Sequence, residues 1–315
     1  MDIENTGAQI DEGLYSRQLY VLGHEAMKKM STSDVLIVGL RGLGVEIAKN
    51  VVLAGVKSVT LYDSEPVQIA DLSTQFFFTD GDLGAPRAYV TQPRLAELNA
   101  YVPVKVLNGH LTHEALDNFK VVVVTEMPFQ QQLELSDYCH AHNIHFISTE
   151  IMCMSNPDSR AFCDFGENFE VSDATGEASL TGMVAAVTSE KEGIVTCLDE
   201  TRHGLEDGDH VTFIELQGIE KLNNAAPRKV KVLGPYTFSI GDTTGHGEYV
   251  TGGIFTQVKI PKTLNFKSLR ASLSNPEYVI SDYAKFDRPA QLHVGFQALH
   301  EFHVLHGRWP RPRNE

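Results

Sequence analysis

The sequence predicts an α/β protein with a doubly wound parallel sheet, an inserted all-β domain and a truncated helical C-terminal segment. Three observations support this prediction. Residues 34–149 alternate strand-like apolar runs with amphipathic helical runs, residues 168–265 hold short β-branched runs between turn signals, and residues 266–315 return to helical spacing. We therefore predict domains at 1–167, 168–265 and 266–315.

The first strand, helix and second strand are predicted to form a βαβ unit. The run "VLIVG" at 35–39 indicates a buried parallel strand, and "GVEIAKNVVLAG" indicates a helix that ends at Gly55. The run "SVTLYD" at 58–63 indicates a second strand that ends in an acid. The alternation continues in helices and strands at 87–101, 102–107, 120–125, 130–143 and 144–149. Such alternation is typical of a doubly wound sheet.

In the second half of the chain, the pattern changes from alternating strands and helices to short strands separated by turns. Short strands are predicted at 183–189, 193–200, 210–218, 228–234, 236–242 and 256–262. Turn sequences such as "EDGD" separate them, as in a sandwich or barrel. Two helices follow, and the second is predicted to bury one apolar face made of Leu292, Phe296, Leu299, Phe302 and Leu305. Two helices cannot cover such faces alone, so we expect the chain to be part of a longer protein.

Composition and charge argue against several classes of protein. The 315 residues include 42% hydrophobic and 21% charged residues, as globular domains do. The formal net charge of −15, with no lysine or arginine cluster along the sequence, argues against nucleic acid or membrane as a partner. The N-terminus lacks an apolar signal region and the four cysteines lack paired spacing, so we expect an intracellular protein without a metal site.

The glycine loop after the first strand leaves its own function open. Its glycines are Gly39, Gly42 and Gly44, whereas a dinucleotide-binding loop has its middle glycine one position earlier. Arg41 stands there, and its side chain would either block a pyrophosphate or bind it. Asp63 could accept hydrogen bonds from ribose hydroxyls, as the acid after the second strand does in such units. The loop alone fits a nucleotide site and a tight structural turn equally well.

Several long blocks of the sequence resemble the ubiquitin-activating enzymes, E1. They include "LYSRQLYVLG", "GLRGLGVEIAKN", "DSEPVQIADLSTQFF", "GPYTFSIGD" and "AKFDRPAQLHVGFQALH". The resemblance implies that 1–167 is an inactive, Rossmann-like adenylation domain, that 168–265 is the first catalytic-cysteine half-domain, and that 266–315 begins a four-helix bundle. It also implies that the chain is an N-terminal fragment of such an enzyme.

The resemblance further implies that the glycine loop is a relic. Active adenylation halves carry an Asn-x-Asn-Arg-Gln stretch that contacts ATP, whereas this chain has "DLSTQ" at 71–75 and lacks the arginine. Active halves place a lysine after an Asp-x-Gly, where this chain has Ala85, and Arg87 would compensate only partly. The metal-binding aspartate has no clear counterpart, although Glu126 lies nearby. We therefore expect no functional cofactor site at the relic loop, which comprises Gly39, Arg41, Gly42, Gly44 and Asp63.

One residue of this inactive half is expected to take part in catalysis. The segment "YSRQ" resembles the one from which an arginine crosses to the ATP held by the active half, and that arginine is here Arg17. Arginine suits the role because it stays charged and can bind phosphate oxygens through two hydrogen bonds. The alternative is an exposed helical arginine that pairs with Glu12 or Glu25.

For the complete protein, the resemblance implies ATP-dependent ubiquitin activation in the cytoplasm and nucleus. Such an enzyme uses ATP and Mg to adenylate the C-terminus of ubiquitin, forms a thioester with it, and passes it to a ubiquitin-conjugating E2 enzyme. This chain would scaffold the active half and help to bind ubiquitin, and alone it would hold no cofactor and be inactive. The alternatives are a free-standing NAD- or nucleotide-dependent enzyme, or the inactive subunit of a heterodimeric activator of a ubiquitin-like modifier. The sequence leaves the preferred modifier open.

Some clusters of reactive residue types have simpler interpretations. Cys139, His140, His142 and His145 are close in sequence but lack a zinc-like spacing, so we expect core or solvated side chains. None of the four cysteines of the chain lies in a stretch that resembles the catalytic nucleophile's.

Two other segments contain candidate residues or depart from the family. Glu200, His203 and Asp207 could serve as general acids or bases, but the run that contains them is better explained as a turn between strands. The segment 151–160 departs from the family. Apolar or sulfur-containing side chains replace polar ones at Met152, Cys153 and Met154.

Overall fold

The structure, a computed structural model, describes residues 11–153, 157–171, 178–198, 201–278 and 283–310, and within 151–160 it describes the backbone alone. The chain divides into two compact units. The first contains Met1–Asp11, His24–Phe169 and Asn265–Glu315, and the second contains Glu12–Gly23 and Glu170–Leu264.

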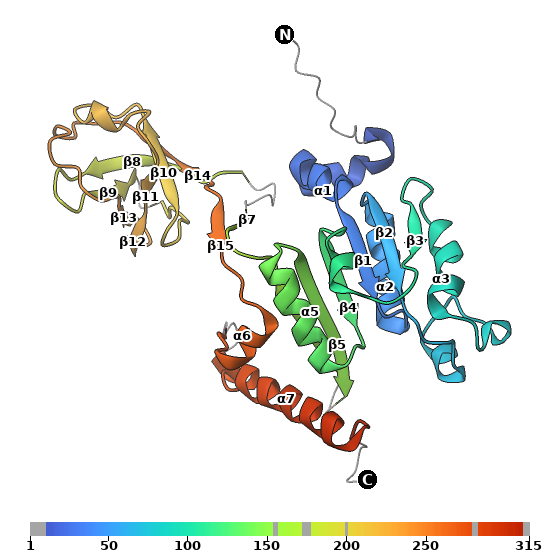
Figure 1. Cartoon of the computed structure of the whole chain (residues 1–315). Helices are drawn as coiled ribbons and strands as arrows, with labels where there is room; N and C mark the ends of the chain where they lie inside the picture. Colours follow the sequence, from blue (N-terminus) through green and yellow to red (C-terminus); the bar gives the residue numbers. More distant parts are fainter. Residues whose placement is uncertain (1–10, 154–156, 172–177, 199–200, 279–282, 311–315) are drawn as a thin grey trace. The chain divides into compact units, whose positions relative to one another are not determined.

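The first unit is built on a six-stranded sheet in the order β3-β2-β1-β4-β5-β6 (Figure 1). Its strands are β1 (Asp34–Val38), β2 (Ser58–Tyr62), β3 (Val104–Val106), β4 (Val121–Thr125), β5 (His145–Cys153) and β6 (Pro157–Asp164). The first five are parallel, in the order of a doubly wound sheet. The predicted α/β fold is therefore confirmed. Strand β6, antiparallel to β5, was not predicted.

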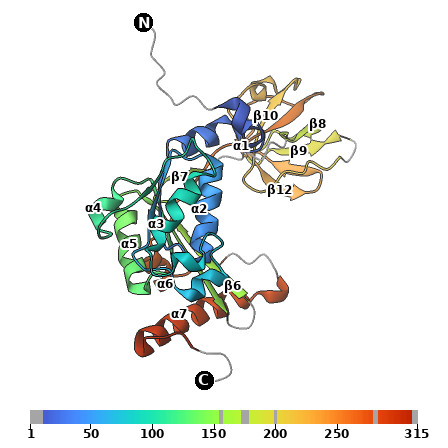
Figure 2. The same ribbon diagram turned by 90° about the vertical axis from the view of Figure 1, so that its right-hand side faces the viewer.

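Helices cover both faces of this sheet (Figures 1 and 2). They are α2 (Gly42–Ala54), α3 (Arg87–Ala96), α4 (His113–Leu116) and α5 (Phe129–Ala141). In β1, Val35 and Ile37 join the apolar core under α2 and α3, while Leu36 and Val38 join the core under α4 and α5. Both faces of the strand are buried because successive side chains point to opposite sides, which explains its continuous apolar run.

The C-terminal helices attach to this unit through polar contacts. They are α6 (Leu269–Ser274) and α7 (Arg288–His306). The backbone N–H of Leu269 donates to the hydroxyl of Ser136 on α5 at 2.9 Å, and Nε2 of His300 lies 2.9 Å from Oε2 of buried Glu150 on β5. Phe296 is buried as predicted, but Leu305 is 71% exposed. The predicted apolar face is thus wrong at its end, and polar His300 on the same helix is buried beside Glu150.

The second unit is dominated by a seven-stranded sheet in the order β11-β10-β14-β8-β9-β13-β12. Its strands are β8 (Thr181–Val187), β9 (Ile194–Cys197), β10 (His210–Ile214), β11 (Arg228–Lys229), β12 (Lys231–Gly234), β13 (Thr237–Ser239) and β14 (Ile254–Val258). The edge strands β11 and β12 are separated in the chain by Val230 alone, so the sheet curls until its edges meet in one segment. A single apolar core fills its interior.

Two short elements complete the description. Strands β7 (Phe169–Val171) and β15 (Lys262–Leu264) pair where the chain enters and leaves the β domain. Helix α1 (Glu12–Ser31) is interrupted at Gly23, whose φ of 79° is not helical. No helix in the described part of the chain is long and apolar enough to cross a membrane.

Candidate functional site

The glycine loop lies between β1 and α2, at the carboxyl end of the sheet, where doubly wound proteins bind their ligands. Gly39 has a φ of +90°, and a Cβ there would lie 2.4 Å from the carbonyl oxygen of Thr125. A Cβ on Gly44 would lie 1.9 Å from the carbonyl oxygen of Gly39. Both glycines are therefore required by close packing of the loop against β4 and α2, with or without a nucleotide.

Asp63, the candidate ribose-binding acid, binds the protein itself. Its Oδ2 accepts a hydrogen bond from the backbone N–H of Leu40 at 2.9 Å, and its Oδ1 accepts one from the N–H of Glu65 at 3.0 Å. Oδ1 also lies 3.4 Å from Nη1 of Arg87. The side chain of Asp63 is only 7% exposed. Asp63 therefore links the glycine loop to the start of α3.

Arg87 is the centre of this arrangement. Its side chain is 2% exposed, and its Nε donates to Oδ2 of Asp71 at 2.8 Å. Asp71 also accepts a hydrogen bond from the N–H of Gln68 at 2.9 Å. The Nη2 atom of Arg87 is buried without a hydrogen-bond partner among the described residues. Arg87 thus neutralises two buried carboxylates, and sequence reasoning, which assigned it a partial phosphate-binding role, missed this.

Arg41 and Glu126 form the outer part of the same network. Nε of Arg41 lies 3.4 Å from Oδ1 of Asp71 and 3.4 Å from Oε2 of Glu126. Glu126 directly follows β4 in the left-handed conformation, with a φ of 54°. Burial raises the pKa of Glu126, and the Arg41 guanidinium opposes that shift. We call Arg41, Asp63, Asp71, Arg87 and Glu126 the loop network.

The stretch at 71–75, which the sequence resemblance aligns with the ATP-contacting stretch of active halves, buries Asp71 and Gln75 and leaves Ser73 and Thr74 exposed. It lies in the 3-10 helix η1 (Ile69–Ser73) and the residues after it. Gln75 is fully buried, and its Nε2 donates to the hydroxyl of Thr91 on α3 at 3.1 Å. Its Oε1 accepts from the N–H of Phe77 at 2.8 Å. These groups therefore hold the crossover between β2 and α3.

The chain is then found to be similar to known proteins. The family model described as the ubiquitin-activating enzyme E1 FCCH domain matches residues 190–259, and the E1 four-helix bundle model matches 260–315. The chain is 56% identical over 98% of its length to ubiquitin-like modifier-activating enzyme 1 of Homo sapiens. It is also 56% identical over its full length to ubiquitin-activating enzyme E1 1 of Schizosaccharomyces pombe.

The chain is similar to the ubiquitin-activating enzymes, E1, over nearly its whole length. The resemblance predicted from the sequence is thus confirmed, and the matches agree with an N-terminal portion of an E1. The chain spans only 29% of the human relative's length and 31% of the fission yeast relative's. Among solved structures, E. coli MccB with ATP has a TM-score of 0.39 and 21% identity, over 44% of each chain.

Arg17, the residue expected to act across an interface, lies in the first part of α1. Its side chain is exposed. Within the described residues it forms no salt bridge with Glu12 or Glu25, the partners of the alternative interpretation. Its guanidinium is therefore available to another molecule or to another part of a longer protein.

The cysteine and histidine cluster on α5 separates into unrelated contacts. Cys139 is fully buried, and burial raises its pKa to about 12. Nδ1 of His140 lies 2.8 Å from Oδ2 of Asp164, while His142 stacks on Tyr138. Among the described residues, no group of three or more histidines, cysteines or acids is placed to hold a metal ion. Cys153, Met152 and Met154 lie outside the residues whose side chains are described.

The candidate acids and bases of the β domain are likewise engaged. Nδ1 of buried His203 accepts from the N–H of Leu205 at 2.9 Å, and its Nε2 lies 2.8 Å from the carbonyl oxygen of Gly234. Oδ1 of Asp207 accepts from the N–H of Val232 at 2.6 Å. Glu200 lies outside the described residues. His203 and Asp207 therefore shape the loop, as the turn interpretation predicts.

Proposed function

We propose that this chain is a non-catalytic part of an ATP-dependent ubiquitin-activating enzyme. In that proposal the longer protein adenylates the C-terminus of ubiquitin, forms a thioester with it and passes it to a conjugating E2 enzyme. The names of the E1 relatives support the enzyme class. The observation that carries the role of this chain is the loop network, whose cations and carboxylates bind one another.

The loop network leaves little for a nucleotide to bind. Adenylation requires cations, usually with a metal, that stabilise the charge developing on the α-phosphate. Here Arg87 is buried between Asp63 and Asp71, and Arg41 lies against two carboxylates. The network has three acids for two arginines, so its excess charge is negative and would repel phosphate. We therefore assign ATP and Mg to the part of the longer protein that lies outside this chain.

Arg17 is proposed to bind the ATP held by that other part. It is an exposed arginine with no carboxylate at salt-bridge distance among the described residues. A guanidinium without a competing carboxylate can offer all its N–H groups to phosphate oxygens. In this respect Arg17 differs from Arg41 and Arg87, which are both held by carboxylates.

The β domain is proposed to help bind ubiquitin, and the protein is proposed to act in the cytoplasm and nucleus. The match of 190–259 to an E1 domain supports the first proposal. The net charge of −15 favours a partner with basic surfaces, because complementary charge speeds association.

The direct test uses the full-length protein and ATP–pyrophosphate exchange in the presence of ubiquitin. Arg17→Ala should slow the exchange by about a hundredfold, the usual effect of removing one group that stabilises transition-state charge. Lys28→Ala is the matched control, because it removes an exposed cation from the same helix, and its exchange rate should not change. An unchanged rate in a folded Arg17→Ala protein would refute the crossing role of Arg17.

A further inference from the structure

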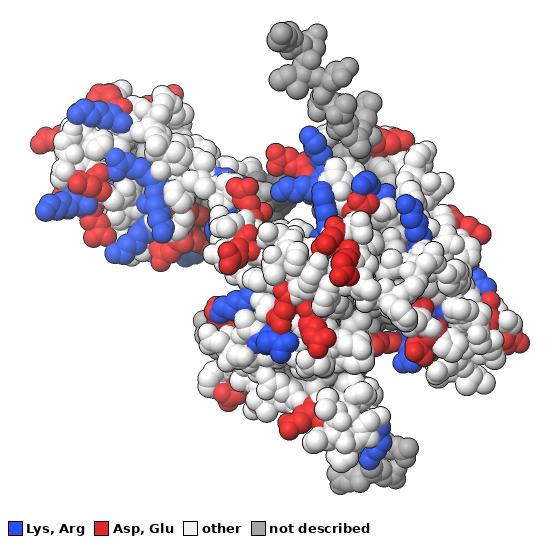
Figure 3. Space-filling model, in the orientation of Figure 1, with Lys and Arg blue, Asp and Glu red and all other residues white. Residues whose placement is uncertain are grey.

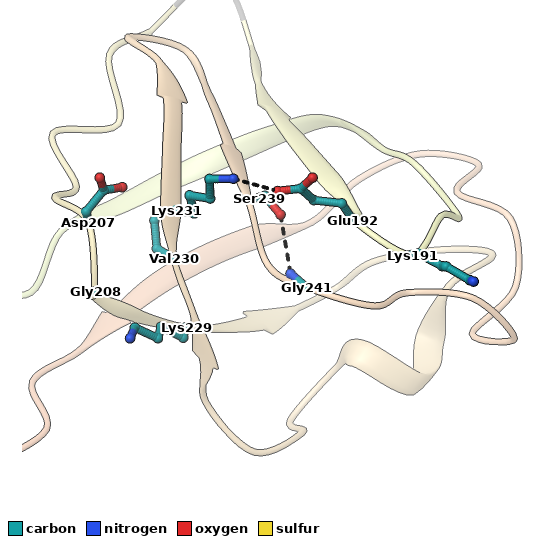
Figure 4. Close-up of a pocket in the computed structure, with 9 residues that line it drawn as sticks. All are labelled: Lys191, Glu192, Asp207, Gly208, Lys229, Val230, Lys231, Ser239 and Gly241. Carbon is teal, nitrogen blue, oxygen red and sulfur yellow. Dashed lines mark hydrogen bonds and ion pairs between the residues drawn. The ribbon is translucent and has the colours of Figure 1, made fainter.

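The β domain carries a hollow of about 800 Å³ where the edges of its sheet meet. Strands β11 and β12, the turn before β9, and the loop before β10 surround it (Figure 4). Its lining residues are Lys191, Glu192, Asp207, Gly208, Lys229, Val230, Lys231, Ser239 and Gly241. We call this hollow the lysine pocket. Mouths of curled sheets are a common place for ligands.

Three lysines meet at this pocket from segments that are distant in sequence. The fold places Lys191 around the same pocket as Lys229 and Lys231, together with Glu192 and Asp207. Figure 3 shows lysine and arginine side chains interspersed with acidic side chains on the face of the β domain in view.

The two carboxylates of the lysine pocket are already occupied. Oε1 of Glu192 lies 3.1 Å from Nζ of Lys231, and Asp207 accepts the backbone N–H of Val232. The neighbouring Arg228 is held by the carbonyl oxygens of Ile240 and Asp242.

Lys191 and Lys229 differ from these residues in that they are exposed and have no carboxylate at salt-bridge distance among the described residues. Hydrogen bonds from Thr244 lower the pKa of the Asp242 carboxyl, and Lys191 lies near enough to that carboxyl to help. Both ammonium groups are nevertheless exposed and open to a ligand. An ammonium offers three donors and a full charge to an anion.

The directions of the lysine side chains decide between a compact and an extended ligand. Figure 4 shows Lys191 and Lys229 at different places around the pocket, with their ammonium groups directed away from each other. One phosphate or sulfate ion could not contact both. A chain with carboxylates at intervals could contact each in turn and lie along the backbone of Gly208, Val230 and Gly241.

We propose that the lysine pocket docks an extended acidic segment of a partner polypeptide. The pocket lies within the β domain alone, and the proposal requires neither the loop network nor Arg17.

The test is a titration of the 315-residue chain, labelled with ¹⁵N, with a short peptide of alternating aspartate and glutamate. Backbone signals of Gly208, Val230, Ser239 and Gly241 should shift, and added salt should weaken the effect by screening. A peptide of asparagine and glutamine with the same length should shift none of them. If the acidic peptide leaves these signals in place, or if inorganic phosphate shifts them equally, the proposal is wrong.

Variants assign the effect to the two lysines. The double variant Lys191→Gln with Lys229→Gln should weaken peptide binding about tenfold, since each removes one exposed ion pair. The double variant Lys105→Gln with Lys262→Gln makes the same change of charge elsewhere and should weaken it less than about twofold.

Equal weakening by the two double variants would show general attraction and would overturn the proposal. Lys191→Arg with Lys229→Arg keeps the charge and should retain binding. If the double glutamine variant does not fold, the double arginine variant still tests the proposal. Loss of peptide binding in a folded arginine variant would contradict a charge-based contact.

Discussion

At the glycine loop the charged side chains bind one another, and those of Asp63, Asp71 and Arg87 are buried. At the lysine pocket, Lys191 and Lys229 are exposed and have no carboxylate within salt-bridge distance among the described residues. A buried charge must be paired within the protein, whereas an exposed charge can be left for a partner because water solvates it. Asp63, Asp71 and Arg87 therefore stabilise the fold although they lie where related folds bind a nucleotide. Lys191 and Lys229 are available to a partner although no sequence motif marks them.

The largest expected effect is on folding, at Arg87. Arg87→Ala should lower the free energy of unfolding by about 3–5 kcal/mol, because it leaves two buried carboxylates without their cation. Urea denaturation of the chain measures this value. Arg41→Ala is the control, because Arg41 is 44% exposed and should cost less than about 1 kcal/mol. Equal costs for the two variants would show that the network is not organised around Arg87.

A smaller loss of stability is expected when a side chain is added to the glycine loop at Gly44. Gly44→Ala should cost about 1–3 kcal/mol, because its Cβ would overlap the carbonyl oxygen of Gly39 and move α2. Gly42→Ala is its control in the same helix, since the nearest atom to that Cβ is 3.0 Å away on the side chain of Thr74. If thermal unfolding places both variants at the same stability, the glycines are not kept by packing.

Glu126 gives a pH-dependent comparison. Its pKa is raised in the folded protein, so ionisation of Glu126 lowers stability as the pH rises above its ordinary pKa of 4.5. Glu126→Gln lacks this loss, and its stability relative to the unaltered chain should therefore increase with pH in that range and level off above the folded-state pKa. Chemical denaturation at a series of pH values measures the difference. A difference that does not vary with pH would contradict the raised pKa.

The smallest effect on stability is expected at the lysine pocket. The double variant Lys191→Gln with Lys229→Gln should change the free energy of unfolding by no more than about 0.5 kcal/mol, because neither lysine has a carboxylate partner to lose. Calorimetric unfolding of this variant and of Arg87→Ala gives the loss of stability at the lysine pocket and at the loop network by the same method. If the double lysine variant loses nearly as much unfolding free energy as Arg87→Ala, the two regions do not differ in their contribution to stability.

The fold could be predicted because its signals are local. The apolar run of β1, the helix that ends at Gly55 and the acid after β2 all lie within one continuous stretch, and the structure has each of them. Strand β6 was missed because it follows β5 closely in a segment with mixed composition. Leu305 was placed in the core by helical spacing alone, which could not foresee that His300 would pair with Glu150.

The site was harder to predict because its contacts join distant residues. The sequence indicated that the loop from Gly39 to Gly44 departs from a working nucleotide site. It could not show that Arg87 faces Asp63 and Asp71, since only the crossover between β2 and α3 brings them together. The sequence signal was weak, since Arg87 lies 24 residues after Asp63 and 16 residues after Asp71.

The most direct test of the central claim is a calorimetric titration of this chain with Mg-ATP and, separately, with NAD. If the loop network fills the nucleotide position with its own ion pairs, a folded sample should give no binding heat with either ligand. Binding of either one with a dissociation constant near micromolar, lost in Gly44→Ala, would contradict the account, because the glycine loop would then be a working nucleotide site.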